Sequence, residues 1–166
     1  IVEMQKKYNW PSSIIGSTGK NNKERIIEAT SILGESYSFG MAVQSMNDKV
    51  LDNINRSNIK LDHYTAINSH LKKSGRNTVT ELIIGLPGET KDSFTNGLRD
   101  LIDAETDRLT IYTLMMLYGT EFKDPEYRAS FKMKGKYRIV PLNIGEYDGT
   151  KIFDYEEVCV ENEDMS

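Results

Sequence analysis

The residues best suited to chemistry lie in segment 80–90, where a short apolar run meets a glycine-proline turn. Pro87 presets the backbone of a turn, and Gly88 can adopt the positive φ that such turns require. Thr90 can cap a helix that follows. Because α/β proteins build their sites at the carboxyl ends of parallel strands, residues 85–89 are predicted to form a shelf for a cofactor.

Glu81 places a carboxylate inside this apolar strand. Burying a charge there costs free energy unless it faces a polar cavity or finds a partner. Strand alternation puts Glu81 on the same side as Ile83 and Gly85, opposite Leu82 and Ile84. Glu81 is therefore a candidate catalytic carboxylate inside a barrel. The alternative is that it lies near the start of the strand and contacts solvent.

Polar residues also follow a second apolar strand, at Gln44, Ser45 and Asn47. Amide and hydroxyl groups at the carboxyl end of a strand can bind a ribose or a carboxylate. The simpler alternative is that Ser45 or Asn47 caps the next helix. Arg56 ends that helix, where its guanidinium suits bidentate binding of a carboxylate or ordinary complementation of the helix dipole.

Phosphate-binding, metal and thiol sites find little support in the sequence. Residues 16–21 contain two glycines and a lysine, but a P-loop needs four residues between its glycines and Ser or Thr after the lysine. We interpret this segment as a turn between a strand and a helix. His63 and His70 lack an acid or thiol at ligand spacing, so no metal ligand is predicted. The single cysteine, Cys159, cannot by itself hold an iron-sulfur cluster.

Composition places the chain among single-domain globular proteins. Its 166 residues are 38% hydrophobic and 28% charged, enough for a sizeable core. The net charge of −4 does not favour binding to the negatively charged backbone of nucleic acid. The longest apolar stretch, residues 109–118, is about half of what a membrane helix needs, and no signal-peptide pattern is present. We therefore expect a cytoplasmic protein that binds neither nucleic acid nor membranes.

Short apolar runs alternate with amphipathic helical patterns, which is typical of βα units and a parallel sheet. Strands are predicted over residues 12–18, 38–45, 79–86 and 109–117. Helices are predicted over residues 22–33, 47–55, 61–73 and 90–104. Because four parallel strands do not close a barrel, they form an open sheet or are completed by strands that precede Ile1.

The alternation ends near residue 122, and prolines and glycines interrupt the rest of the chain. We therefore expect a first unit over residues 1–122 and a C-terminal extension over residues 123–166, with a small antiparallel element. The chain begins with Ile1 rather than Met, and residues 3–10 look like the end of a helix. These two features lead us to expect a piece of a longer protein.

Four segments, taken together, resemble a known family. Residues 43–47, 51–59, 80–90 and 117–122 are similar, in order and spacing, to the second half of the radical S-adenosylmethionine (SAM) core. More narrowly, they resemble the class whose members often carry a cobalamin-binding domain ahead of that core. The resemblance covers about residues 1–122. It implies a partial (βα) TIM-like barrel of six strands, of which this chain supplies about four.

The resemblance also implies roles for individual residues. Gln44 and Ser45 would contact the ribose or the methionyl part of SAM, and Arg56 would pair with the methionyl carboxylate. Glu81 and Tyr112 would face the substrate cavity and are the candidate catalytic residues. The implied adenine pocket consists of Ile83, Gly85, Leu86, Pro87, Gly88 and the backbone of Leu114, Met115, Met116 and Leu117.

Enzymes of this family hold a [4Fe-4S] cluster in a three-cysteine loop. They cleave SAM reductively to a 5′-deoxyadenosyl radical, or transfer a methyl group with the help of cobalamin. This chain has no such loop. The resemblance therefore implies the adenine- and ribose-binding half of an enzyme, inactive alone, whose cluster is bound by the remainder of its own polypeptide. It leaves open the use of cobalamin and the substrate, a small molecule or a peptide. The alternative is a non-catalytic α/β nucleotide-binding module.

Overall fold

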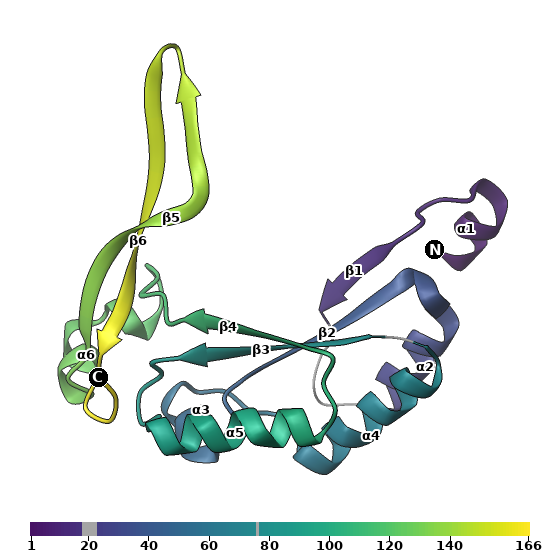
Figure 1. The fold of residues 1–166 in the computed structure, drawn as a ribbon, viewed down its shortest axis with the longest axis horizontal. Coiled ribbons are helices and arrows are strands. Elements are labelled where there is room, and N and C mark those ends of the chain that lie inside the picture. The colour runs from purple at the N-terminus through teal and green to yellow at the C-terminus, as the bar shows by residue number, and fades with distance from the viewer. Residues whose placement is uncertain (18–22, 76) are drawn as a thin grey trace.

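The computed structural model describes residues 1–17, 23–75 and 77–166 (Figure 1). Four parallel strands form the main sheet in the order β1-β2-β3-β4, so the predicted α/β class with a parallel sheet is confirmed. Most of the turn predicted over residues 16–21 lies outside the described residues. The strands are β1 (Ile14–Ser17), β2 (Tyr37–Gln44), β3 (Thr78–Ile84) and β4 (Arg108–Thr113).

A layer of helices covers one face of this sheet (Figure 1). Its members are α2 (Lys23–Leu33), α3 (Asp48–Asn53), α4 (Leu61–Lys73) and α5 (Lys91–Asp103), while α1 (Val2–Tyr8) precedes the sheet and the 3-10 turn η1 (Gly34–Ser36) follows α2. In α4, the buried Tyr64, Ile67 and Leu71 recur at helical spacing and belong to the main core cluster. No helix among the described residues combines the length and apolar character needed to cross a membrane.

Side-chain caps fix where two of these helices begin. Thr90 Oγ1 accepts a hydrogen bond from Ser93 N at 3.0 Å, and Ser93 Oγ accepts one from Thr90 N at 3.0 Å, which completes a capping box for α5. Asn47 Oδ1 accepts from Lys49 N at 3.0 Å and caps α3. The predicted Thr90 cap is confirmed. Of the two candidates for the α3 cap, the structure selects Asn47 over Ser45.

The sheet has one covered and one open face. Thr80 and Leu82 of β3 are buried on the side of the helices, where the Thr80 hydroxyl hydrogen-bonds with that of Tyr64. The alternation of side chains along β3 places Glu81 on the other face of the sheet, where its neighbour on β4 is Thr110. None of the described helices covers that face (Figure 1).

One long hairpin dominates the C-terminal extension. The chain passes through the 3-10 turn η2 (Glu121–Lys123) and α6 (Pro125–Ser130), and then β5 (Lys134–Tyr147) pairs antiparallel with β6 (Thr150–Glu161). Figure 1 shows the hairpin projecting from the sheet on the side opposite to the helices. Both strands are longer than the small element predicted from the sequence. The division into two units near residue 122 stays a prediction.

The base of the hairpin joins the carboxyl end of the main sheet. Met116 N donates a hydrogen bond to Glu157 O at 2.8 Å, and Cys159 N donates one to Leu114 O at 2.9 Å. The final predicted strand is therefore too long. β4 ends at Thr113: Leu114 N still donates to Ile84 O at 3.0 Å, but Leu114 O and Met116 N bond to β6.

Glu157 anchors this joint through two ion pairs. Its carboxylate contacts Lys123 and lies 3.0 Å from Arg128 Nη2, and its side chain is only 8% exposed. Hydrogen bonding from Lys123 and then Arg128 holds the pKa of Glu157 below its usual value of 4.5. Because the folded pKa is lowered, the stabilisation is present above about pH 4.5 and is lost as the pH falls through the lowered value.

We expect Glu157→Gln to weaken the loss of stability between neutral pH and about pH 3, because an amide does not titrate. The measurement is the urea midpoint of wild type and variant at each pH. Glu161→Gln is the control, since Glu161 forms an exposed ion pair with Lys134 at 2.6 Å and such pairs contribute little. Identical pH profiles for wild type and Glu157→Gln would contradict this role.

Candidate functional site

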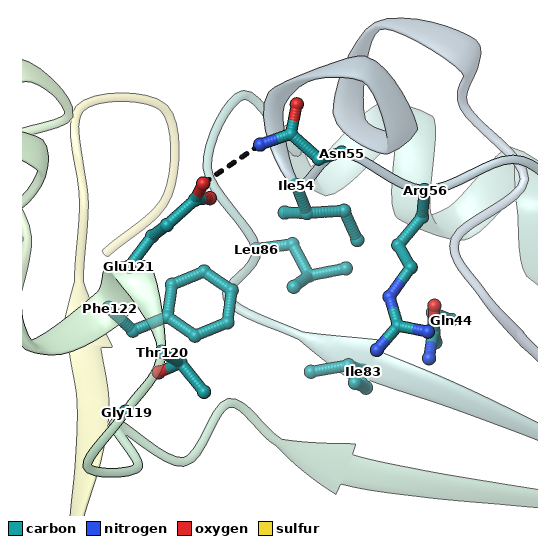
Figure 2. Close-up of a pocket in the computed structure, with 10 residues that line it drawn as sticks. All are labelled: Gln44, Ile54, Asn55, Arg56, Ile83, Leu86, Gly119, Thr120, Glu121 and Phe122. Carbon is teal, nitrogen blue, oxygen red and sulfur yellow. Dashed lines mark hydrogen bonds between the residues drawn. The ribbon is translucent and has the colours of Figure 1, made fainter.

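A cavity of about 300 Å³ opens at the carboxyl ends of β2 and β3 (Figure 2). Its wall includes Gln44 from β2, Ile83 from β3 and Leu86 from the turn that follows. This is the edge of a parallel sheet at which α/β proteins bind ligands. The other lining residues are Ile54, Asn55 and Arg56 after α3, and Gly119, Thr120, Glu121 and Phe122 after β4. The cavity therefore joins segments that lie far apart in the sequence.

The backbone at both strand ends is left-handed. Gln44 has a φ of +65°, where the pairing of β2 with β3 shifts register, and Gly85 has a φ of +92°. For a residue other than glycine this conformation is strained, and such strain concentrates at functional sites. Gln44 Oε1 is buried and has no hydrogen-bond partner among the described residues. It can therefore accept a hydrogen bond from a ligand.

Arg56 brings a positive charge to the same wall. Figure 2 shows its guanidinium beside Gln44 and Ile83. The backbone N–H of Arg56 donates to Leu51 O at 2.9 Å, which fixes the chain just after α3. Within the described ranges, Arg56 forms no ion pair. Because no described carboxylate pairs with it, the guanidinium of Arg56 can bind a carboxylate of a ligand bidentately.

The opposite wall is held by a hydrogen bond from Asn55 Nδ2 to Glu121 Oε1 at 2.9 Å (Figure 2). This bond connects the exit of α3 to η2, next to Phe122. Neither Asn55 nor Glu121 is among the site residues predicted from the sequence. Both lie in segments that carry the family resemblance, which is the signal that could identify them.

The shelf after β3 lies partly under the cavity. Leu86 lines the cavity, whereas Pro87 and Gly88 are buried in the turn behind it. Asn53 Nδ2 donates to Pro87 O at 3.0 Å and ties this turn to the end of α3. Gly88 has a φ of +83°, and an added Cβ would lie 2.4 Å from Asn53 Nδ2. The position therefore requires glycine.

Glu89 ends the shelf as a buried carboxylate. It is 1% exposed and accepts hydrogen bonds from Ser45 Oγ at 2.5 Å and from Ser93 Oγ. It also lies at the start of α5, where the helix dipole favours a negative charge. Ser45 Oγ accepts from Asn47 N at 3.1 Å as well. The hydroxyl predicted to contact SAM is thus engaged inside the protein, and Ser45 does not line the cavity.

The predicted adenine segment after β4 contributes no side chain to this cavity. Leu114 and Met116 are buried in an apolar cluster, and Leu114 O and Met116 N bond to β6. Met115 and Leu117 are exposed and lie outside the lining. The wall on this side comes instead from residues 119–122, which follow directly.

The two candidate catalytic residues share the open face of the sheet. Tyr112 pairs with Ile83, two residues along β3 from Glu81, so Glu81 and Tyr112 point to the same side. Tyr112 is 46% exposed. Neither residue lines the cavity. The open face is therefore a second surface, next to the strand ends that form the cavity.

Metal and thiol chemistry lack a site in the described part of the chain. It holds no group of three His, Cys, Asp or Glu side chains that could bind a metal ion. Cys159 is buried, and burial raises the pKa of its thiol. The reactive thiolate form is therefore disfavoured.

Sequence comparison finds relatives among named enzymes. The chain is 28% identical over 130 residues to the cobalamin-dependent radical SAM methyltransferase TokK of Streptomyces tokunonensis, covering 76% of this chain and 19% of that protein. It is 28% identical over 138 residues to a 2-(S-pantetheinyl)-carbapenam-3-carboxylate methyltransferase of Streptantibioticus cattleyicolor, covering 81% and 20%. It is 29% identical over 133 residues to the ribosomal protein uS12 methylthiotransferase RimO of Thermosipho melanesiensis, covering 79% and 28%. No family model matches.

A solved structure shares the fold. The radical SAM enzyme coproporphyrinogen III oxidase (HemN) of Escherichia coli matches with a TM-score of 0.53 and 24% identity, over 63% of this chain and 24% of that chain. The chain spans about a fifth of the length of the first two relatives. These findings confirm the resemblance carried by the four motifs: the chain is similar to radical SAM enzymes and corresponds to the C-terminal half of their core.

Proposed function

We propose that the chain is the part of a radical SAM enzyme that binds the adenine and ribose of SAM, and that it is inactive alone. The observation that carries this proposal is the cavity where Gln44, Arg56, Ile83 and Leu86 meet. Three relatives are methyltransferases or a methylthiotransferase by name, which supports group transfer as the reaction of the parent enzyme. The match to TokK favours methyl transfer that depends on cobalamin.

The lining residues fit the parts of SAM. Ile83, Leu86 and Phe122 offer an apolar surface to the adenine ring. Gln44 Oε1 can accept a hydrogen bond from a ribose hydroxyl, and Arg56 can pair with the methionyl carboxylate. When bound, SAM supplies radical or methyl-transfer chemistry. The residues of this chain bind it, orient it and keep water from its adenine face.

An iron-sulfur cluster does not fit this chain. Such a cluster needs several thiolates, and Cys159 is the only cysteine. We therefore assign the cluster to the remainder of the polypeptide, which is also the principal partner of this chain. Nothing in the proposal requires nucleic acid or a membrane, and a cytoplasmic location accords with it.

The sheet is, in this proposal, part of a barrel. β1 lies at one end of the sheet, and its Ile15 is 87% exposed. An edge strand with an exposed apolar side chain can pair with further strands. Strands from the rest of the polypeptide would pair there and enclose the open face. A small-molecule or peptide substrate would then bind against Glu81 and Tyr112.

The test is a titration of the ¹⁵N-labelled chain with SAM, followed through the amide chemical shifts. We expect the shifts to concentrate at Gln44, Ile83, Leu86 and Gly119. Arg56→Ala should weaken binding about tenfold or more, because a hydrogen bond to a charged group is lost.

Arg138→Ala is the matched control for Arg56→Ala. Arg138 forms an ion pair with Glu156 on the hairpin at 2.7 Å and takes no part in the cavity, so its loss should leave SAM affinity unchanged. Binding of adenosine as tightly as SAM, with no loss in Arg56→Ala, would indicate the non-catalytic nucleotide-binding module instead. Absence of shifts around the cavity at high SAM concentration would refute the proposal.

Glu81→Leu is expected to leave the isolated chain at least as stable as wild type. Glu81 is partly buried and has neither a hydrogen bond nor an ion pair to another described residue, and leucine adds apolar burial. In the parent enzyme the same change should lower turnover about tenfold or more if the carboxylate acts on substrate. Urea unfolding and single-turnover kinetics measure the two effects. A marked loss of stability would show instead that the carboxylate is structural.

A further inference from the structure

The chain returns to the shelf of the cavity after the hairpin. Asn162 follows β6 and is 6% exposed. Its Nδ2 donates hydrogen bonds to Gly85 O at 3.0 Å and to Leu86 O at 3.2 Å. Its Oδ1 accepts from Asp164 N at 3.0 Å and from Met165 N at 2.9 Å. The nitrogen and the oxygen of this side-chain amide therefore both form hydrogen bonds within the protein.

The carbonyls of the shelf lie beyond the strand ladder. Pairing between β3 and β4 ends one residue before Gly85. Gly85 also has a φ of +92°, which turns its peptide away from the strand direction. A buried carbonyl without a donor is unfavourable. Asn162 supplies the donor to Gly85 O, and it shares Leu86 O with Glu89 N, which donates at 3.1 Å.

The loop that carries this amide is itself anchored. Glu163 N donates to Phe131 O at 2.9 Å, next to α6, and Cys159 N donates to Leu114 O at 2.9 Å, next to β4. Cys159 also packs beside the shelf, because its O would lie 3.8 Å from a Cβ added to Gly85. With the loop fixed on two sides, the amide can determine the position of the shelf rather than follow it.

We propose that Asn162 is a positioning residue for SAM. It orients the carbonyls of Gly85 and Leu86, and thereby sets where the Leu86 side chain stands in the cavity wall. This inference rests on the proposed function of the cavity, in which Leu86 and Ile83 offer the apolar surface to adenine (Figure 2). Asn162 lies outside the segment that resembles the radical SAM core. The C-terminal extension therefore completes a site that the core begins.

The chemistry at this position is specific to asparagine. Its amide offers two N–H donors and an oxygen with two lone pairs, which matches two carbonyls on one side and two N–H groups on the other. Aspartate has nearly the same shape but would place a second oxygen against the carbonyls of Gly85 and Leu86. Asn162→Asp therefore changes the direction of hydrogen bonding with little change in volume.

The test compares Asn162→Asp and Asn162→Ala with the control Asn143→Ala. Asn143 Nδ2 donates to Asp154 Oδ2 at 2.6 Å on the exposed hairpin, so the control also removes an amide hydrogen bond. We expect the SAM affinity of the folded protein to fall about tenfold in both Asn162 variants and to stay unchanged in the control. The ¹³C shifts of the Gly85 and Leu86 carbonyls should move in the Asn162 variants even without SAM.

Unchanged SAM affinity in folded Asn162 variants would overturn the proposal, whatever their stability. If both variants unfold, a chain that ends at residue 163 decides the question, because it keeps Asn162 but removes the N–H groups that hold its Oδ1. Weaker SAM binding by that folded chain supports the proposal, and its unfolding or unchanged binding refutes it. Failure of wild type to bind SAM would refute the proposed function, while the carbonyl shifts would still show whether Asn162 orients the shelf.

Discussion

Gly88→Ala is expected to destabilise the chain by about 3 kcal/mol and to disrupt SAM binding. Gly88 has a φ of +83°, a conformation that costs an alanine about 1 to 2 kcal/mol. The added Cβ would lie 2.4 Å from Asn53 Nδ2 and would push this amide off Pro87 O. The free energy of unfolding, measured by urea denaturation with far-UV circular dichroism, reports the loss.

Gly75→Ala serves as a control that measures the cost of placing alanine at positive φ without a steric clash. Gly75 has a φ of +70°, but an added Cβ would meet no heavy atom within 4 Å, so this change should cost only about 1 to 2 kcal/mol. In an Asn53→Ala background, the additional cost of Gly88→Ala should approach that of Gly75→Ala, since the obstructing amide is gone. Equal costs of the two glycine changes in wild type would disprove the contact.

Glu89→Ala is expected to lower stability by about 2 kcal/mol, because the buried Ser45 hydroxyl loses its acceptor, whereas Ser93 Oγ can still donate to Thr90 O at 3.1 Å. Ser45 Oγ and Ser93 Oγ both donate to this carboxylate, which is 1% exposed. The change should also weaken SAM binding, since Ser45 follows Gln44 directly and its hydroxyl would no longer be held. Urea denaturation and the SAM titration measure the two effects.

Glu161→Ala is the control for Glu89→Ala. It removes an exposed ion pair with Lys134 and should cost less than about 1 kcal/mol. Glu89→Gln should fall between the two, because its amide oxygen can still accept one hydroxyl. If Glu89→Ala were no more harmful than Glu161→Ala, the link between the end of β2 and the start of α5 would be unimportant for stability.

The helical layer follows from local sequence rules because spacing and caps agree there. α4 has the predicted bounds, and the apolar spacing correctly predicts that Tyr64, Ile67 and Leu71 are buried, but it also selects Leu61, which is exposed. Thr90 caps α5 as predicted. Each helix buries one stripe against the sheet, so its sequence carries enough information by itself.

An antiparallel element in the extension was predicted, but its length was not, because the two strands break the rules for strands. β5 contains Pro141, and its pairing with β6 shifts register between Ile139 and Ile144. Leu142, inside this irregular stretch, has a φ of +65°. Proline and a bulge both weaken the alternating pattern. They are tolerated because, in the described part of the chain, the distal half of β5 pairs on one side only.

Part of the cavity wall consists of residues that the sequence analysis names. Gln44, Arg56, Ile83 and Leu86 line it, whereas their contacts with SAM stay a prediction. Ser45 has a suitable hydroxyl, but Glu89, 44 residues further on, binds it. Asn162 reaches the shelf across 77 residues. Contacts between residues so far apart in the sequence depend on the completed fold, so local sequence patterns do not predict them.

The same separation of 77 residues between Asn162 and Gly85 affects the order of events during biosynthesis. A polypeptide can begin to fold from its N-terminal side while the ribosome is still extending it. The parallel sheet and its helices could therefore associate in a nascent chain whose Gly85 carbonyl still lacks its donor. If the cavity binds SAM and Asn162 positions the shelf, as proposed, the chain gains its full affinity for SAM only after translation has passed residue 162.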